Sequence, residues 1–256
     1  MRSRSRSLLV ALGLVPALLA GCSNSAATDR VPGATVTRDE ANVLAELLHT
    51  NFESGGAHFV ESAPYAEGAL LTVTGTVDFV RSVGTAQAVT SYQDGRPDDT
   101  RTLFFTPNDI WFGQVPGLSS ALATAGLPPA TYVRRPMTAS SEGSPTLVDV
   151  LLQLVLNLSS RSGDDPRAFL DGHYTWQGQR SIDGHLASVY HLSGGQSVAV
   201  AASDKQLLQY VTPLPGQSFQ VTITLSDHSG QQIDLPADTD TVNATAHPEI
   251  AAQLGV

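Results

Sequence analysis

Hydrophobic residues recur at two different spacings along the chain, and these spacings predict one helix followed by many strands. Apolar residues recur every three or four positions over residues 37–54, which predicts an amphipathic helix. Thr37 and Glu40 fit a capping box at its start, and Gly55-Gly56 marks its end. From residue 57 onward the apolar positions mostly alternate with polar ones, which predicts strands.

The predicted strands are short and are separated by turn residues. Phe219, Val221, Ile223 and Leu225 alternate cleanly, so their strand should bury one face. Gly75 interrupts an alternating run and predicts a bulge. Because tight turns rather than helical crossovers join the strands, we expect an antiparallel sheet. The predicted strands cover residues 57–62, 69–80, 84–93, 101–106, 109–114, 132–138, 173–182, 186–193, 197–202, 206–211 and 218–225.

The middle of the chain has a helical pattern instead. A short helix is predicted over residues 118–125, and a helical turn follows Asp164-Asp165-Pro166. Residues 147–158 form a third predicted helix, with Ser144 as its cap and Pro145 at its first turn. This helix is apolar nearly all round, so it should be buried on several sides or line an apolar space.

The first residues predict export. Three arginines precede an apolar run, Leu8 to Ala20, which is too short to cross a bilayer that needs roughly 20 apolar residues. Leu19-Ala20-Gly21-Cys22 resembles the lipobox of bacterial lipoproteins, which implies cleavage before Cys22 and its lipidation. We therefore expect a signal peptide at 1–21, a tether at 22–36, one domain at 37–243 and a tail at 244–256. The lipid would hold the protein at the outer face of the cell membrane.

The net charge of the chain limits the classes of molecule that it can bind. The chain has 14 Lys and Arg, of which three precede Cys22, and 24 Asp and Glu, so the processed chain would carry a net charge of −13. This balance argues against a nucleic-acid partner, which requires a basic face. A single cysteine also excludes an internal disulfide.

No pattern predicts catalysis. The seven histidines have no spacing typical of a metal site, and the serine and glycine motifs of hydrolases and phosphate-binding loops are missing. Asp98-Asp99 and Asp164-Asp165 could serve a glycosidase, but next to proline they are more typical of caps and solvated loops. We expect no enzyme activity, no metal and no cofactor.

The order of elements and the C-terminal third resemble the actinobacterial lipid-carrier lipoproteins typified by LprG and LppX. The strand at 197–202 runs into Ser203-Asp204-Lys205, and the strand at 218–225 leads to Ser226-Asp227-His228-Ser229-Gly230. Ile233-Asp234-Leu235-Pro236 then closes the pattern. His228 replaces an aromatic residue of the family pattern, and Ser229 is inserted before the glycine.

The resemblance implies an α+β fold in which a curved antiparallel sheet, an open half-barrel like that of LolA, covers inserted helices. It also implies an apolar cavity that carries acylated lipids or lipoglycans, and a membrane exporter as partner. The residues expected to line the cavity are Leu151, Leu154, Val155, Leu158, Phe79, Phe104, Trp111, Phe112, Val221 and Ile223.

A second hypothesis stays open. Apolar residues are buried by default, so each of these side chains could equally belong to a filled core. The protein would then be a non-carrying interaction, accessory or sensor lipoprotein of the cell surface. Cavity volume separates the two hypotheses, because ligand sites are typically larger than about 300 Å³.

Overall fold

The computed structural model describes residues 30–66, 68–138, 146–214 and 218–255. Cys22, the signal peptide and Ser144-Pro145 lie outside this part of the chain. Residues from Val31 onward form one compact unit. No helix of the described residues is long and apolar enough to cross a membrane.

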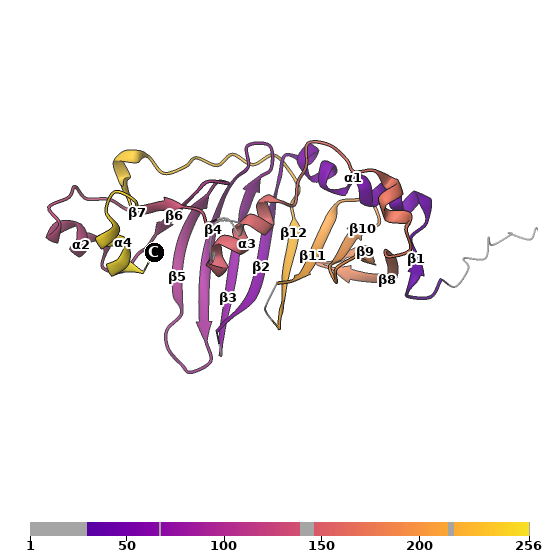
Figure 1. Ribbon diagram of the computed structural model, residues 1–256, viewed down its shortest axis with the longest axis horizontal. Helices are drawn as coiled ribbons and strands as arrows, with labels where there is room; N and C mark the ends of the chain where they lie inside the picture. Colours follow the sequence, from indigo (N-terminus) through magenta and orange to yellow (C-terminus); the bar gives the residue numbers. More distant parts are fainter. Residues whose placement is uncertain (1–29, 67, 139–145, 215–217, 256) are drawn as a thin grey trace, which may run out of the picture. The chain divides into compact units, whose positions relative to one another are not determined.

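The described part of this unit contains one open sheet of thirteen strands (Figure 1). The strand order is β1-β8-β9-β10-β11-β12-β2-β3-β4-β5-β6-β7-β13, so β1 and β13 form its edges. The first seven strands are Ala34–Thr35 (β1), Gly56–Ala66 (β2), Ala69–Asp78 (β3), Val83–Tyr92 (β4), Asp99–Phe105 (β5), Asp109–Gly113 (β6) and Tyr132–Pro136 (β7). The others are Thr175–Ile182 (β8), His185–His191 (β9), Ser197–Ala201 (β10), Leu207–Pro213 (β11), Gln220–Ser226 (β12) and Thr241–Asn243 (β13).

Most neighbouring strands are joined by short turns and pair antiparallel, as the sequence predicts. The exception is β13, which pairs parallel to β7, so the sheet is mixed. The bulge predicted at Gly75 is wrong, because Gly75 pairs in regular register with Phe59 and Ala86. The lack of a side chain at Gly75 instead lets the neighbouring backbone approach closely, because an added Cβ would lie 2.1 Å from the carbonyl oxygen of Thr85.

Four α-helices lie in the described residues: Arg38–Ser54 (α1), Leu118–Thr124 (α2), Leu147–Leu156 (α3) and Pro248–Leu254 (α4). Short 3₁₀ helices span Pro166–Leu170 (η1) and Asp238–Asp240 (η2). The capping box predicted for α1 is present, since Thr37 accepts from the Glu40 backbone and Glu40 accepts from the Thr37 backbone. The cap predicted at Ser144 is wrong: α3 begins at Leu147, and its cap is Thr146, which accepts a hydrogen bond from the backbone of Asp149.

The compact unit extends beyond the expected limits of residues 37 and 243. Strand β1 adds Ala34 and Thr35 to the sheet beside β8, within the segment expected to be a tether. Helix α4 packs against α2, and its Ile250 is buried, within the segment expected to be a tail. Both ends therefore contribute to the folded core.

Helices α1 and α3 cover the same face of the sheet. Both contact β2, and α1 also contacts β11 and η1 (Figure 1). One hydrophobic cluster includes Leu47 of α1, Leu152 of α3 and Ile223 of β12, so the helices and the sheet share a core. The alternation predicted for β12 is confirmed, because Val221, Ile223 and Leu225 are all buried.

An ion pair fixes the first turn of α3 to the sheet. The Asp149 side chain is fully buried, and its Oδ1 lies 2.9 Å from Nη2 of Arg135 on β7. The Arg135 Nη1 donates to Asp149 Oδ2 at 3.1 Å, and the guanidinium lies over the Phe112 ring. Arg135 thereby neutralises Asp149, the one carboxylate on the buried side of α3.

We expect Arg135→Ala to destabilise the protein by about 3–5 kcal/mol, because it leaves the Asp149 carboxylate buried without a cation. Urea unfolding followed by circular dichroism measures this change. Arg96→Ala is the matched control, since Arg96 forms an exposed ion pair with Asp94 and should leave the midpoint unchanged. Equal midpoints for Arg135→Ala and the control would contradict the role of the buried pair.

Candidate functional site

An apolar cavity of about 230 Å³ lies where α1 and the end of α3 meet strands β9 to β11. Most of its wall is leucine and aromatic carbon, and the polar groups are few. The residues that line it are Leu44, Leu47, Leu48, Leu154, Asn157, Leu158, Asp164, Phe169, Leu192, Val198, Leu207 and Tyr210. Composition and position make it the candidate site for an apolar ligand.

Helical periodicity places the leucines of α1 on this wall. Leu44, Leu47 and Leu48 follow the three- and four-residue spacing that brings side chains onto one helix face. Leu154 and Leu158, four residues apart, approach the cavity from α3 and the segment that follows it. The floor is formed by strands of the sheet, where Val198 of β10 and Leu207 of β11 belong to the main core.

Residues 157–164, which we call the strap, tie the end of α3 to α1. The Asn51 Nδ2 donates to the carbonyl of Leu158 at 2.7 Å, and Asn51 is fully buried. Two backbone hydrogen bonds also join the strap to α1. The amide of Ser160 donates to the carbonyl of Leu48, and the amide of Asp164 donates to the carbonyl of Ala45. The strap therefore holds the cavity wall in place through main-chain and amide bonds.

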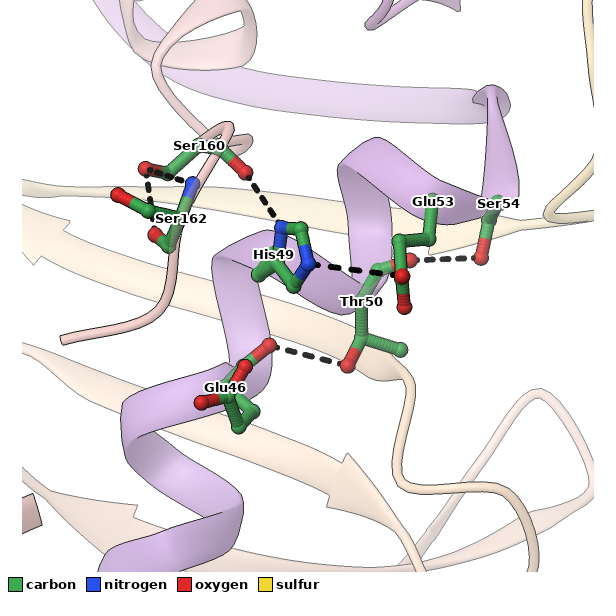
Figure 2. Close-up of polar contacts among 7 residues, drawn as sticks. All are labelled: Glu46, His49, Thr50, Glu53, Ser54, Ser160 and Ser162. Atoms are coloured by element: carbon green, nitrogen blue, oxygen red, sulfur yellow. Dashed lines mark hydrogen bonds and ion pairs between the residues drawn. The ribbon is translucent and has the colours of Figure 1, made fainter.

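Side chains of α1 add polar contacts to the strap (Figure 2). The His49 Nδ1 lies 3.3 Å from the carbonyl of Ser160, and its Nε2 lies 3.5 Å from a carboxylate oxygen of Glu53. The Ser160 hydroxyl in turn donates to the carbonyl of Ser162 at 2.8 Å. These bonds make the strap and α1 one unit, whereas α3 itself contacts the sheet mainly through apolar side chains.

A second, more polar pocket of about 420 Å³ lies on the other side of the strap. Phe52, Phe79 and Leu156 supply apolar surface, and the Arg161 guanidinium lies 5.8 Å from the centre of the Phe52 ring. Asn157 lines both pockets, so the two spaces meet at the start of the strap. An apolar space and a polar space thus adjoin at the end of α3.

The residues predicted to line a cavity fall into three groups. Leu154 and Leu158 line the apolar cavity, and Phe79 lines the polar pocket. A second group is buried in the main core between the helices and the sheet: Leu151, Val155, Phe112, Val221 and Ile223. The third group is Phe104 and Trp111, which lie outside both pockets and outside the main core.

Phe104 and Trp111 are opposite each other on β5 and β6, and they lie on the sheet face away from α3. Side chains alternate between the two faces of a strand, and the neighbouring Leu103 and Phe105 are the ones in the core. Phe104 instead packs edge-on against Tyr132 of β7. The prediction that these two residues face the helices is therefore wrong. An unbroken apolar run does not show which of its residues lie on which face of the sheet.

Sequence reasoning missed Glu61, the most unusual residue on the helix-covered face. Glu61 of β2 is fully buried, and neither carboxylate oxygen has a hydrogen-bond partner among the described residues. Its neighbours in the ladder are Val73 and Ile223, both fully buried and apolar. Burial raises the pKa of the Glu61 carboxyl well above its ordinary value. Burial therefore favours the protonated form of this carboxyl.

A sequence signal for Glu61 did exist. Ala57, Phe59, Glu61 and Ala63 occupy alternate positions of one strand, so the glutamate falls on the apolar face. No group of three or more His, Cys, Asp or Glu that could hold a metal ion occurs in the described ranges. The unusual chemistry of this face thus comes from one isolated carboxyl.

Comparison with known proteins gives limited similarity. No family model matches the chain, and no curated protein matches it. Among solved structures, LprF from Mycobacterium bovis aligns with a TM-score of 0.46 and 13% identity, over 80% of this chain and 99% of that one. An uncharacterized conserved protein from Thermus thermophilus aligns with a TM-score of 0.39 and 9% identity, over 79% and 98%. At this level of similarity, function must be argued from the site itself.

We expect Glu61→Gln to make the stability of the protein less dependent on pH. A raised pKa in the folded state means that the unfolded chain releases this proton first, so stability is complete below the ordinary pKa and is lost as pH rises toward the folded pKa. The unfolding equilibrium constant should therefore rise by up to about tenfold per pH unit in this window for the wild type, relative to Glu61→Gln. Urea unfolding over a series of pH values measures the difference.

Glu61→Leu should be more stable than the wild type at neutral pH, since it removes a buried polar group without a partner. Asp234→Asn serves as the control, because Asp234 is an exposed carboxylate that forms no ion pair with a described residue, and this variant should leave the pH profile unchanged. Parallel pH profiles for the wild type and Glu61→Gln would show that the buried carboxyl is not linked to folding.

Proposed function

We propose that this protein binds the acyl chain of a lipid or lipoglycan in the apolar cavity between α1, α3 and strands β9 to β11. The observation that carries the proposal is the cavity wall, which is mostly leucine and aromatic side chains and lies beside a polar pocket. Each methylene that leaves water for such a wall contributes about 0.8 kcal/mol. Binding of this kind needs no catalytic residue.

The neighbouring pocket suits the polar end of the same ligand. Ser159, Ser160 and Arg161 offer hydroxyl groups and a guanidinium, and no described residue forms an ion pair with Arg161. A chain on one side of Asn157 and a headgroup on the other would match an amphiphile. The ligand class is therefore an acylated molecule with a hydroxylated or anionic head.

Lipidation of Cys22 would complete this role. An anchored protein at the outer face of the cell membrane would meet its ligand in the bilayer and deliver it to a partner, such as a membrane exporter. The lipobox-like run Leu19-Ala20-Gly21-Cys22 and the net charge of −13 that the processed chain would carry support attachment by lipid rather than by surface charge.

A second candidate function rests on the size of the cavity. Its volume of about 230 Å³ is below the roughly 300–1,000 Å³ of typical ligand sites. Leu151, Leu152 and Val155 of α3 are also fully buried, so the layers are in close contact beside the cavity. A tethered accessory or sensor protein with a filled core would have this interior.

Lipid binding separates the two candidates. The full chain carrying Cys22→Ala, which removes the acceptor of the proposed anchor, is titrated with a neutral monoacylglycerol whose fluorescent group responds to apolar surroundings. We expect saturable binding by this protein, called the parent below. Absence of binding, together with no lipid in native mass spectrometry, would favour the accessory protein.

Leu154→Trp should weaken binding at least tenfold, about 1.4 kcal/mol, because the larger side chain fills the cavity. Leu48→Trp fills it from α1 and gives an independent test. Leu186→Trp is the matched control, since Leu186 is 54% exposed on β9 and does not line the cavity. Circular dichroism verifies folding, and equal affinities for all folded variants would contradict the assigned site.

A further inference from the structure

Glu61 is a costly residue for the position that it occupies. A buried polar group without a hydrogen bond loses its hydration and gains nothing in exchange, and buried groups of this kind are few in native proteins. Both oxygens of Glu61 are in this state within the described structure. A leucine or methionine would fill the same place at lower cost, so the closed core is less stable than its sequence could make it.

Among the described residues of the elements that contact β2, no charge beside Glu61 offsets its ionisation. Strand β2 contacts β3, β12, α1 and α3. The residues of β3 and β12 beside Glu61 are Val73 and Ile223, and the buried face of α1 carries only one polar side chain, that of Asn51. On α3 the buried charge is Asp149, which Arg135 already neutralises. The buried carboxyl can thus ionise only if water reaches it.

Helix α3 is the element whose movement would admit water. Strands β3 and β12 are hydrogen-bonded to β2, and α1 is tied to the strap by the amide of Asn51 and by backbone bonds. The buried face of α3 is apolar except for Asp149, and its Gln153 bonds the carbonyl of Thr138 rather than the sheet beneath. Separation of α3 from β2, between its ion-paired first turn and the strap, therefore breaks packing but no ladder of hydrogen bonds.

We propose that Glu61 is a proton-coupled latch for α3: release of its proton favours a state in which α3 has moved away from β2 and the apolar cavity is enlarged. The proposal rests on the proposed function, since it assigns regulation to the same cavity. When α3 separates, Glu61 enters water, loses its proton and is stabilised as a carboxylate. The open population then increases up to about tenfold per pH unit between the pKa of the exposed carboxyl and that of the buried one.

Hydrogen exchange of the ligand-free parent tests the latch. Exchange is measured by mass spectrometry at a series of pH values above the ordinary pKa of a glutamate, and is corrected for the intrinsic pH dependence of amide exchange. We expect the protection of α3 amides to fall with pH more steeply than that of β3 amides. In Glu61→Gln, which stays neutral, α3 protection should not vary with pH, and in Glu61→Leu it should be higher than in the parent at neutral pH.

Two results would overturn the latch. One is an equal pH dependence of α3 protection in the parent and in Glu61→Gln. The other is a parallel loss of protection in α3 and β3, which would mean that Glu61 is linked to global unfolding alone. Asp234→Asn, an exposed charge change outside the helices, should reproduce the behaviour of the parent.

The binding assay keeps this test separate from that of the proposed function. The neutral monoacylglycerol probe has no titratable group, so its affinity for the parent should increase with pH while that for Glu61→Gln stays constant. Absence of binding by the parent at every pH overturns the proposed function. Binding that has the same pH dependence in both proteins overturns the latch and leaves the function standing.

Discussion

The apolar contact between α3 and the sheet determines how much space remains between the helices and the sheet. The sheet is open, so the face that carries Val73, Val221 and Ile223 must be covered by other elements to form a core. Helices α1 and α3 both contact β2, and α1 also contacts β11. The apolar cavity lies where these two helices meet, and its volume therefore depends on the position of α3.

The two helices are attached by different kinds of contact. The cavity wall formed by α1 and the strap is therefore fixed, and the part formed by α3 can move. Helix α1 and the strap are joined by the buried amide of Asn51 and by two backbone bonds, and such bonds keep one geometry because a broken bond leaves a buried polar group without a partner. Helix α3 is fixed at its first turn by Asp149 and Arg135. Between these two attachments its contacts with the sheet are apolar side chains, which tolerate displacement with a graded rather than an abrupt cost.

The sequence contains most of the information on elements but less on their register and partners. Alternating residues predicted nearly all strands, and the capping box placed the start of α1 within one residue. Phe104 and Trp111 were misplaced because a continuous apolar run does not indicate which residues face the core; the pairing of β5 with β6 decides it. The parallel pairing of β13 with β7 and the docking of α4 join distant segments, so no local pattern could reveal them. Glu61 had a local signal, but its lack of a partner is a property of the folded core.

The proposed two states of α3 would explain the cavity size and the buried carboxyl together. A cavity of about 230 Å³ holds only part of a lipid, so binding a whole acyl chain requires α3 to move. Exposing Leu151, Leu152 and Val155 in that movement costs on the order of 5–9 kcal/mol, at about 1.5–3 kcal/mol for each side chain. Hydration of Glu61 returns roughly 2–7 kcal/mol, the cost of keeping a polar group buried without a hydrogen bond. An acyl chain that then covers the exposed side chains recovers much of the remainder, so ligand and water together offset the separation that neither would favour alone.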